Sequence, residues 1–288
     1  MELYGGDLRI MKLAEMLAEE NHTVFIYGHE KYFNDYDLEN ESKKNYIKLC
    51  KSLTEVIENS NIIISGMPIS KDGITVTAPY SNEIIRLDVL VEQLEGKLFL
   101  AGGIPKWFKE KAEHKKIQIG DFLESESLNI VNAIPTVEGA IKIAIEETPY
   151  TIHESNVLVL GYGRIGKILC DKLDYLGANV YCATRREADF SWLKEKRIKS
   201  VKYDEIHKMC QNIDFIINTV PSVVIDEKII RNLKKECFII ELASKPGGVD
   251  KSKIEMYNLK VISAQGLPGK VAPITAAKYI KEIIVDKV

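Results

Sequence analysis

The sequence predicts an α/β fold with two doubly wound, mainly parallel sheets. Short apolar runs of strand length alternate with helix-patterned segments along nearly the whole chain, which is the pattern of parallel α/β domains. One long helical segment separates this series into two halves. The 288 residues are 45% hydrophobic and 28% charged, so the chain can bury the cores of two ordinary domains.

The first half alternates strand and helix from its first residues. A short strand enters the glycine turn GGDLR (5–9), and the helix after it presents Ile10, Leu13 and Leu17 on one face. The glycines of this turn do not form a GxGxxG motif, so no nucleotide site is expected here. The remaining strands are expected at 24–27, 62–65, 97–101 and 117–119, and the remaining helices at 53–60, 87–94 and around Trp107 and Phe108. Residues 29–52 are expected to form loops with a short strand, and residues 70–86 a strand or a loop that lines a crevice.

A single helix over 131–150 is expected to connect the two halves. Pro135 stands near its start, and Pro149 ends it because proline cannot continue a helix. The expected divisions are 1–130 for an N-terminal α/β domain of substrate binding and assembly, 131–150 for the connecting helix, 151–270 for a dinucleotide-binding domain and 271–288 for a C-terminal crossover helix.

The second half repeats the alternation around another glycine turn. Residues 157–160 form an apolar strand, and the helix after the turn carries Ile168, Leu169 and Leu173 on one face until Gly177 ends it. The further strands are expected at 180–183, 200–203, 214–218, 238–242 and 261–263, and the further helices at 190–196, 206–210 and from 274 onward.

The turn between the first strand and helix of this half is a GxGxxG motif, Gly161-Tyr162-Gly163-Arg164-Ile165-Gly166. Gly161 permits a tight turn, Gly163 lets a pyrophosphate approach the backbone, and Gly166 lets the helix pack close to the sheet. The helix start offers free N–H groups and the positive end of its dipole to phosphates. The strand–turn–helix context therefore predicts dinucleotide binding by a Rossmann-like domain. The alternative is a Rossmann fold that has lost its cofactor.

The end of the second strand of this domain predicts which dinucleotide binds. An NAD site usually has an acidic residue there, which bonds the ribose 2′-hydroxyl. This strand instead ends in Thr184, Arg185 and Arg186, and no acidic residue precedes Glu187. Because guanidinium groups bind phosphate oxygens as planar, permanently charged forks, the sequence favours NADP over NAD. The alternative is that both arginines are only solvated surface charge.

Loops at the carboxyl ends of later strands predict the rest of the pocket. Thr219 and Pro221 follow the strand 214–218, beside the expected position of the cofactor ribose. The segments ASKPGG (243–248) and GLPGKVAP (266–273) follow the next two strands. Open α/β sheets bind ligands at this edge. The alternative is that these loops are simple chain turns.

Composition excludes several other classes of function. The net charge of −3 gives no basis for nucleic-acid binding, and no apolar stretch is expected to approach the roughly 18 residues of a membrane span. The N-terminus lacks the basic and apolar regions of a signal peptide. The five cysteines are scattered, without zinc spacing, so no metal site is expected. These features indicate a reducing cytoplasm.

Six strings carry a resemblance to a known family. They are IPTVEG (134–139), YTIH (150–153), GYGRIG (161–166), INTVPS (217–222), ELASKPGGVD (241–250) and GLPGKVAP (266–273). Together with GGDLR (5–9) they resemble the A subunits of dipicolinate synthase, in register over nearly the whole chain. The last string also resembles the cofactor loop of methylenetetrahydrofolate dehydrogenases, which adds Gly266, Pro268 and Val271 to the expected cofactor contacts.

The resemblance implies an NADP-dependent oxidoreductase that makes dipicolinate, pyridine-2,6-dicarboxylate. Its substrate would be a dihydrodipicolinate-type precursor from a branch of the lysine pathway, oxidised in the mother cell of a sporulating bacterium. The family's A subunit works with a flavoprotein-like B subunit, and a homo-oligomer is expected. Two carboxylates on the substrate require two anchors that are cationic or rich in N–H groups.

The candidate anchors are Arg9, Lys245 and the backbone amides of Gly247 and Gly248. Arg9 and Lys245 are also the candidate catalytic residues, Lys245 as a base if burial lowers its pKa. Arg9 is equally compatible with a surface role. His153 precedes the Rossmann strand and is interpreted as structural.

Two other interpretations remain open at this point. One is a different NADP-dependent dehydrogenase, of the 2-hydroxyacid or methylenetetrahydrofolate type, although no Arg–Glu–His set of the former is found. The other is a regulatory or scaffold subunit that binds NADP without turnover, because few charged side chains stand out as catalytic.

Overall fold

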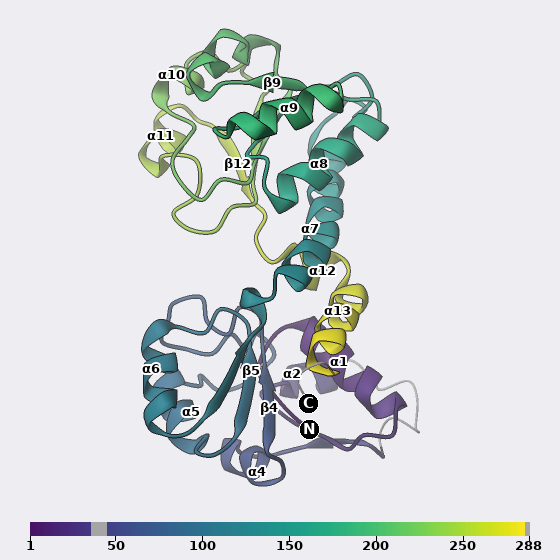
Figure 1. The fold of residues 1–288 in the computed structure, drawn as a ribbon, viewed down its shortest axis with the longest axis vertical. Helices are drawn as coiled ribbons and strands as arrows, with labels where there is room; N and C mark the ends of the chain where they lie inside the picture. Colours follow the sequence, from purple (N-terminus) through teal and green to yellow (C-terminus); the bar gives the residue numbers. More distant parts are fainter. Residues whose placement is uncertain (36–44, 286–288) are drawn as a thin grey trace. The chain divides into compact units, whose positions relative to one another are not determined.

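The computed structural model describes residues 1–35 and 45–285, and the chain divides into two compact units (Figure 1). Unit 1 comprises Met1–Val131 together with Ala272–Val288, and unit 2 comprises Asn132–Val271. Each unit contains one six-stranded sheet. The predicted class, two Rossmann-like parallel-sheet domains with a connecting helix and a C-terminal helix, is confirmed.

Unit 1 is built on a parallel sheet with the strand order β3-β2-β1-β4-β5-β6. Leu3 and Tyr4 are fully buried in different clusters, because successive side chains of a strand point to opposite faces. Its strands are β1 (Glu2–Tyr4), β2 (Val24–Tyr27), β3 (Ile47–Leu49), β4 (Ile62–Ser65), β5 (Leu98–Ala101) and β6 (Gln118–Asp121). Its helices include α1 (Leu8–Glu19), α2 (Glu30–Asp35), α4 (Leu53–Glu58), α5 (Leu87–Gln93) and α6 (Lys106–His114).

Unit 2 has the strand order β12-β11-β10-β7-β8-β9, again with all pairs parallel. The order reverses between β7 and β10, and ligands of open α/β sheets bind at such a switch point. Its strands are β7 (Asn156–Leu160), β8 (Asn179–Ala183), β9 (Lys199–Val201), β10 (Phe215–Asn218), β11 (Phe238–Glu241) and β12 (Lys260–Ser263). Its helices are α8 (Arg164–Tyr175), α9 (Glu187–Glu195), α10 (Glu227–Ile230), α11 (Lys251–Met256) and α12 (Leu267–Val271).

The connecting helix α7 spans Glu126–Glu147, so its predicted start near residue 131 is wrong. Pro135 lies inside the helix, where it lacks the N–H group that would bond the carbonyl of Val131. The helix nevertheless extends further, because Leu128 and Ala133 are buried on either side of the division between the units. A proline at the beginning of an amphipathic pattern marks the start of a helix only when no buried apolar residues precede it at helical spacing. Here Leu128 and Ala133 precede Pro135 and are buried.

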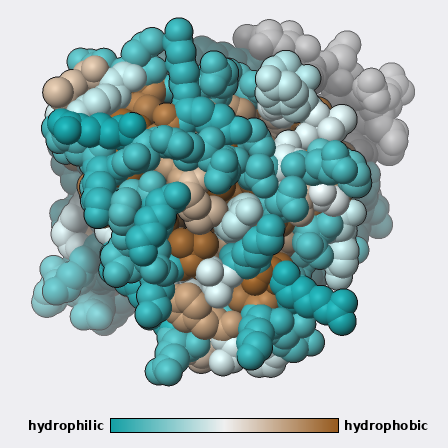
Figure 2. Space-filling model, turned by 90° about the horizontal axis from the view of Figure 1, so that it is seen from above, coloured by the Kyte–Doolittle hydropathy of each residue, from teal (hydrophilic) through white to brown (hydrophobic). Residues whose placement is uncertain are grey.

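By length and composition alone, α7 is apolar enough to cross a membrane, which corrects the expectation that no stretch approaches such a length. Its best window has a mean hydropathy of 1.3. Val137, Ala140 and Ala144 of this helix are buried in the core of unit 2, and Glu138 accepts an ion pair from Lys172 of α8 at 3.0 Å. These contacts are those of a core helix. In the view of Figure 2, hydrophilic side chains cover most of the visible surface.

The C-terminal helix α13 (Pro273–Val285) packs against α1 in unit 1 (Figure 1). Ala277, Ile280 and Ile284 are almost completely buried in the same cluster as Leu13 and Leu17 of α1. Lys281 also forms an ion pair with Glu20 at the end of α1. Helix α13 therefore completes the core of unit 1.

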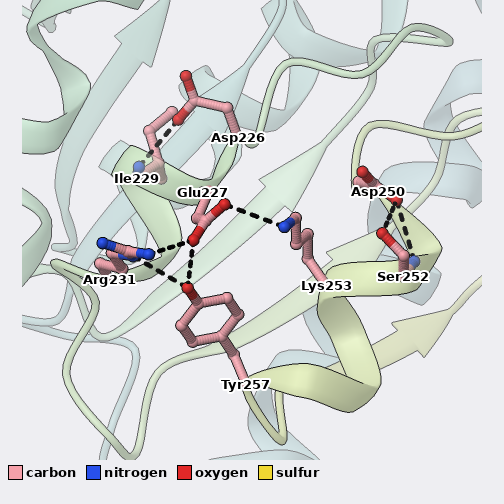
Figure 3. A network of polar contacts seen from close by, with 8 residues as sticks. All are labelled: Asp226, Glu227, Ile229, Arg231, Asp250, Ser252, Lys253 and Tyr257. Carbon is pink, nitrogen blue, oxygen red and sulfur yellow. Dashed lines mark hydrogen bonds and ion pairs between the residues drawn. The ribbon is translucent and has the colours of Figure 1, made fainter.

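Short helices are where the structure departs most from the expected elements. The helix expected at 206–210 consists of two 3-10 segments, η2 (Tyr203–Lys208) and η3 (Cys210–Asn212), and α2, α10 and α11 are additional. Helices α10 and α11 are tied together by Glu227, which accepts from the hydroxyl of Tyr257 at 2.5 Å and from Lys253 at 2.9 Å (Figure 3). These contacts lower the pKa of Glu227 to about 2. These elements were not predicted because helices of one or two turns are too short to show a recurring apolar spacing in the sequence.

Candidate functional site

The three glycines of the turn after β7 meet three different surroundings. Gly161 has φ +94°, and a Cβ there would lie 2.5 Å from Oγ1 of Thr219. A Cβ on Gly166 would lie 2.0 Å from the carbonyl oxygen of Gly161, so only glycine allows α8 this close to the strand. A Cβ on Gly163 would meet nothing within 4 Å.

The open position at Gly163 fits a dinucleotide pyrophosphate. Gly163 is the N-cap of α8, a helix of 12 residues with no acidic residue in its first turn. The free N–H groups and the dipole of this end therefore attract an anion without a competing carboxylate. Arg164 and Lys167 in the first turn are exposed and add positive charge. The residues present suit a bound dinucleotide.

Tyr162 and Ile165 anchor this turn to the core of unit 2 through their side chains. The side chain of Tyr162 is buried in the core of unit 2, and burial raises the pKa of its hydroxyl to about 12. Ile165 packs against the same cluster, and Nζ of Lys167 lies 5.7 Å from the centroid of the Tyr162 ring.

At the end of β8, Thr184 is buried and both arginines are exposed. The hydroxyl of Thr184 donates to Oδ2 of Asp189 at 2.8 Å, and Nε of Arg186 lies 3.9 Å from the other oxygen of the same carboxylate. The guanidinium of Arg185 lies over the ring of Tyr203, 5.3 Å from its centroid. The buried carboxylate of Asp189 is therefore engaged by this strand end and holds it in place.

Thr219 connects the ends of β7 and β10. Its hydroxyl and its backbone N–H both donate to the carbonyl of Leu160, at 2.7 and 3.0 Å. Pro221 follows in an exposed loop. Thr219 therefore lies against the glycine turn, as a residue next to the cofactor should, although its hydroxyl is already engaged by the backbone.

Glu241 organises the ASKPGG loop after β11. Its carboxylate accepts from the amide of Ala243 at 3.0 Å, from the amide of Gly248 at 2.7 Å and from Nδ2 of Asn218 at 2.7 Å. The amide of Gly247 donates to the carbonyl of Ser244 at 3.0 Å. Both glycine amides expected to bind a substrate carboxylate thus have acceptors within the loop itself.

Lys245 is an exposed residue of this loop, between the exposed Ser244 and Pro246, and lines two hollows of unit 2. The smaller has a volume of about 260 Å³ and lies between the loop, α11 and β12. Its other lining residues are Glu241, Pro246, Gly247, Val249, Ile254, Val261, Ser263 and Gln265. The walls are partly apolar and also include the carboxylate of Glu241, which accepts three hydrogen bonds from the protein. Lys245 is the cation of this lining and the group that suits an anion here.

The segment 266–273 is a short helix rather than a loop. Helix α12 spans Leu267–Val271 and packs on α7, where a Cβ on Gly139 would lie 3.1 Å from Leu267. Pro268 is buried, and Val271 packs against the core of unit 2. Gly266, with φ +70° and open space around it, is the exposed member of the three predicted contacts.

Arg9 belongs to unit 1 and is almost fully buried. Its Nε and one terminal nitrogen donate to the two oxygens of Asp7, at 2.9 and 2.8 Å, and that nitrogen also donates to the carbonyl of Met67. Asp7 in turn caps α1. Arg9 thus joins the ends of β1 and β4.

Sequence reasoning missed four residues that position the site: Asn218, Glu241, Asp189 and Tyr203. Asn218 and Glu241 each stand at the carboxyl end of an apolar strand. A polar residue at that position indicates a role at the ligand-binding edge of the sheet, so the sequence did contain a signal for these two residues. Asp189 lies in the first turn of α9, where an acidic residue is common and signals no special role. Tyr203 carries no signal because its partners, Arg185 and Ala183, precede it by a helix and a strand.

Comparisons with known proteins define the class of this chain. Residues 137–254 match the model of the D-isomer specific 2-hydroxyacid dehydrogenase, NAD binding domain. This domain and the open glycine turn make the chain a dehydrogenase-type oxidoreductase with a site for a nicotinamide dinucleotide.

The comparisons then identify its relatives. Residues 2–123 match the model of the N-terminal domain of the dipicolinate synthase A subunit. The chain is 29% identical over 281 residues to the A subunit of dipicolinate synthase from Bacillus subtilis (strain 168), covering 97% of this chain and 92% of that one. The chain is thus similar to the A subunits of dipicolinate synthase over nearly its whole length, which confirms the resemblance that its motifs indicate.

Two crystal structures agree with this relationship. The A subunit of dipicolinate synthase from Bacillus halodurans has a TM-score of 0.83 at 25% identity, covering 99% of this chain and 96% of that one. The corresponding structure from Bacillus subtilis has a TM-score of 0.80 at 28% identity, covering 99% and 94%.

Proposed function

We propose that this chain oxidises a dihydrodipicolinate-type precursor to dipicolinate with NADP, as the A subunit of a dipicolinate synthase. The observation that carries the proposal is the similarity to the A subunit of that enzyme over 97% of the chain. The open pyrophosphate position at Gly163 supports it, because a dehydrogenase requires a bound dinucleotide.

The reaction removes one hydride and one proton from a partly reduced ring, and the gain of aromaticity drives it. The bound nicotinamide would accept the hydride. The protein's tasks are then to position the ring and to hold its two carboxylates. Lys245, beside a pocket of about 260 Å³, is the proposed anchor in unit 2. Its expected role as a base required burial, which this exposed side chain lacks. Arg9 is the proposed cation in unit 1, although Asp7 already holds its guanidinium.

The preference for NADP is proposed from the end of β8. Arg185 and Arg186 are exposed there, whereas the carboxylate of Asp189 is buried and accepts from Thr184. An exposed guanidinium favours a 2′-phosphate, and a buried, engaged carboxylate is poorly placed to bond a ribose 2′-hydroxyl. Titration with both cofactors tests this, and tighter binding of NAD would end the claim.

A test of the reaction uses the purified chain with freshly generated dihydrodipicolinate and NADP. We expect the ultraviolet absorption of a pyridine dicarboxylate to appear with NADPH, and Lys245→Ala to raise KM more than the exposed control Lys235→Ala. The same assay is run with a flavoprotein-like B subunit, the proposed partner. The proposed setting is the cytoplasm of the mother cell, with the chain as a homo-oligomer.

A second candidate is a subunit that binds NADP without turnover. The specific observation in its favour is that Arg9 and the amides of Gly247 and Gly248 already have partners within the protein. This candidate would be favoured by two results together. The chain would bind NADP equally well with and without the B subunit, but turnover would occur only when the B subunit is present.

A further inference from the structure

We infer that Tyr203 is a positioning residue that fixes Arg185 for the 2′-phosphate of the dinucleotide. The inference rests on the proposed NADP preference. Tyr203 opens the 3-10 segment η2 after β9, and Arg185 follows the neighbouring strand β8. The guanidinium carbon of Arg185 lies 5.3 Å from the centroid of the Tyr203 ring, within the range of a cation–π contact.

Tyr203 is itself held in place. Its hydroxyl donates to the carbonyl of Ala183 at 3.3 Å, and its ring packs against the apolar cluster that contains Ala183 and Leu160. Burial raises the pKa of this hydroxyl to about 12, and the group is a hydrogen-bond donor at neutral pH, as an ordinary tyrosine is. The ring is thus attached to the last residue of the strand that presents Arg185.

A guanidinium placed on a ring keeps its donors free. The N–H groups of arginine lie in the plane of the guanidinium, so a ring against one face leaves the rim available to phosphate oxygens. A long side chain loses rotamer freedom when it binds, and a preformed contact reduces that loss. In the part of the chain that the structure describes, no carboxylate pairs with Arg185 and competes for this rim.

Arg186 provides the comparison within the same strand end. Its side chain is 74% exposed, and its nearest carboxylate is that of Asp189, 3.9 Å from Nε. No aromatic contact of Arg186 is present among the described residues. The two arginines thus share charge and location but differ in preorganisation, and Arg185 is the one built to discriminate.

Calorimetric binding of 2′,5′-ADP and of 5′-AMP to the full chain tests the inference, because the two ligands differ only by the 2′-phosphate. Tyr203→Leu removes the ring and should weaken 2′,5′-ADP binding by about two- to five-fold while leaving 5′-AMP binding unchanged. Tyr203→Phe keeps the ring and should retain the wild-type ratio of the two affinities. Thermal unfolding of each variant is measured alongside.

A double mutant tests whether Tyr203 acts through Arg185. In the Arg185→Gln background, Tyr203→Leu should cause no further change in the affinity ratio. If Tyr203→Leu does not fold, Arg185→Lys and Arg186→Lys replace it. Both keep the charge, but only Arg185→Lys removes the guanidinium that lies over the Tyr203 ring, so it should lower the affinity ratio more.

The outcomes separate this inference from the proposed function. A wild-type chain that binds 5′-AMP as tightly as 2′,5′-ADP would overturn the NADP preference and the inference with it. A wild-type preference that Tyr203→Leu leaves intact, or a loss that is equal for both ligands, would overturn only the role of Tyr203.

Discussion

Gly163 and Gly166 lie three residues apart, yet replacement of each by alanine should have a different effect: Gly163→Ala should weaken dinucleotide binding, and Gly166→Ala should lower stability. Gly163 has φ −81° and open space around its Cβ position, so Gly163→Ala should fold with nearly unchanged thermal stability. The added methyl would occupy the pyrophosphate position, and dinucleotide binding should weaken by more than about tenfold, or 1.4 kcal/mol.

Gly166→Ala is the matched variant, because its Cβ would lie 2.0 Å from the carbonyl oxygen of Gly161. The helix must shift away from the strand, which should cost about 1–3 kcal/mol or more of unfolding free energy. Thermal melts and cofactor titrations of both variants distinguish the two effects. If Gly163→Ala melted early or bound normally, the open position would not be the pyrophosphate site.

Glu2 makes a separate residue-scale prediction, about pH. Burial raises the pKa of its carboxyl from 4.5 to about 7, although Lys97 and the N-terminus oppose the shift. Between these values the folded state holds a proton that the unfolded state has released. This group therefore contributes stability below pH 4.5 that is lost as the pH rises to about 7.

The test is Glu2→Gln, which cannot ionise. We expect it to raise the free energy of unfolding at pH 8 by about 1–3 kcal/mol and to change it little at pH 4.5. Urea unfolding at both values measures this, with the exposed Glu113→Gln as the control. An equal effect of Glu2→Gln at the two pH values would show that its pKa is not raised.

At the scale of elements, the ASKPGG loop is held by one carboxylate. In the wild-type chain the backbone N–H of Gly248 donates to the carboxylate of Glu241 at 2.7 Å. In Glu241→Gln, the side-chain NH₂ group of the substituted residue would face this N–H, and two donors cannot bond each other. The loss of this acceptor should cost about 1–3 kcal/mol and loosen residues 243–249. Hydrogen exchange measured by mass spectrometry should show faster exchange there and not in β7, with the exposed Glu236→Gln as control. Unchanged exchange in the loop would mean that other contacts define its shape.

The same loop shows what the sequence could and could not predict. The strand before it and its glycine and proline content are local features, so its position at the carboxyl edge of the sheet was predictable. Which acceptors its amides find depends on Glu241 and Asn218, which are brought together only by the pairing of β10 with β11. The predicted role of Gly248 as a free anion donor ignored this pairing.

The glycine turn was predictable in more detail because each part of it is local. The apolar strand, the three glycines and the apolar period of α8 lie within 20 residues. Gly161 and Gly166 have the positive φ and the close backbone approach expected of them, and the open space at Gly163 is compatible with its predicted role at a pyrophosphate. The start of α7 was not predictable from Pro135, because the residues that extend the helix are buried by partners far along the chain. Local rules fail where tertiary burial decides.

At the scale of the whole molecule, the chain returns to unit 1 after completing unit 2. Removing residues 272–288 would expose the face of α1 that α13 covers, including the side chains that pack on Ile280 and Ile284. Burial of the two isoleucines alone contributes about 3–6 kcal/mol. We therefore expect the truncated chain to lose the folded state of unit 1 while unit 2 still binds NADP.

Calorimetric unfolding with and without NADP measures this directly, because a ligand raises only the transition of the unit that binds it. The transition that does not respond to NADP should disappear or move to lower temperature on truncation. Ile280→Ala should give a milder form of the same effect, about 2–5 kcal/mol, and the exposed Lys278→Ala should not. If truncation lowered the NADP-responsive transition instead, the C-terminal helix would support the dinucleotide domain, and the division of the chain into these two units would be wrong.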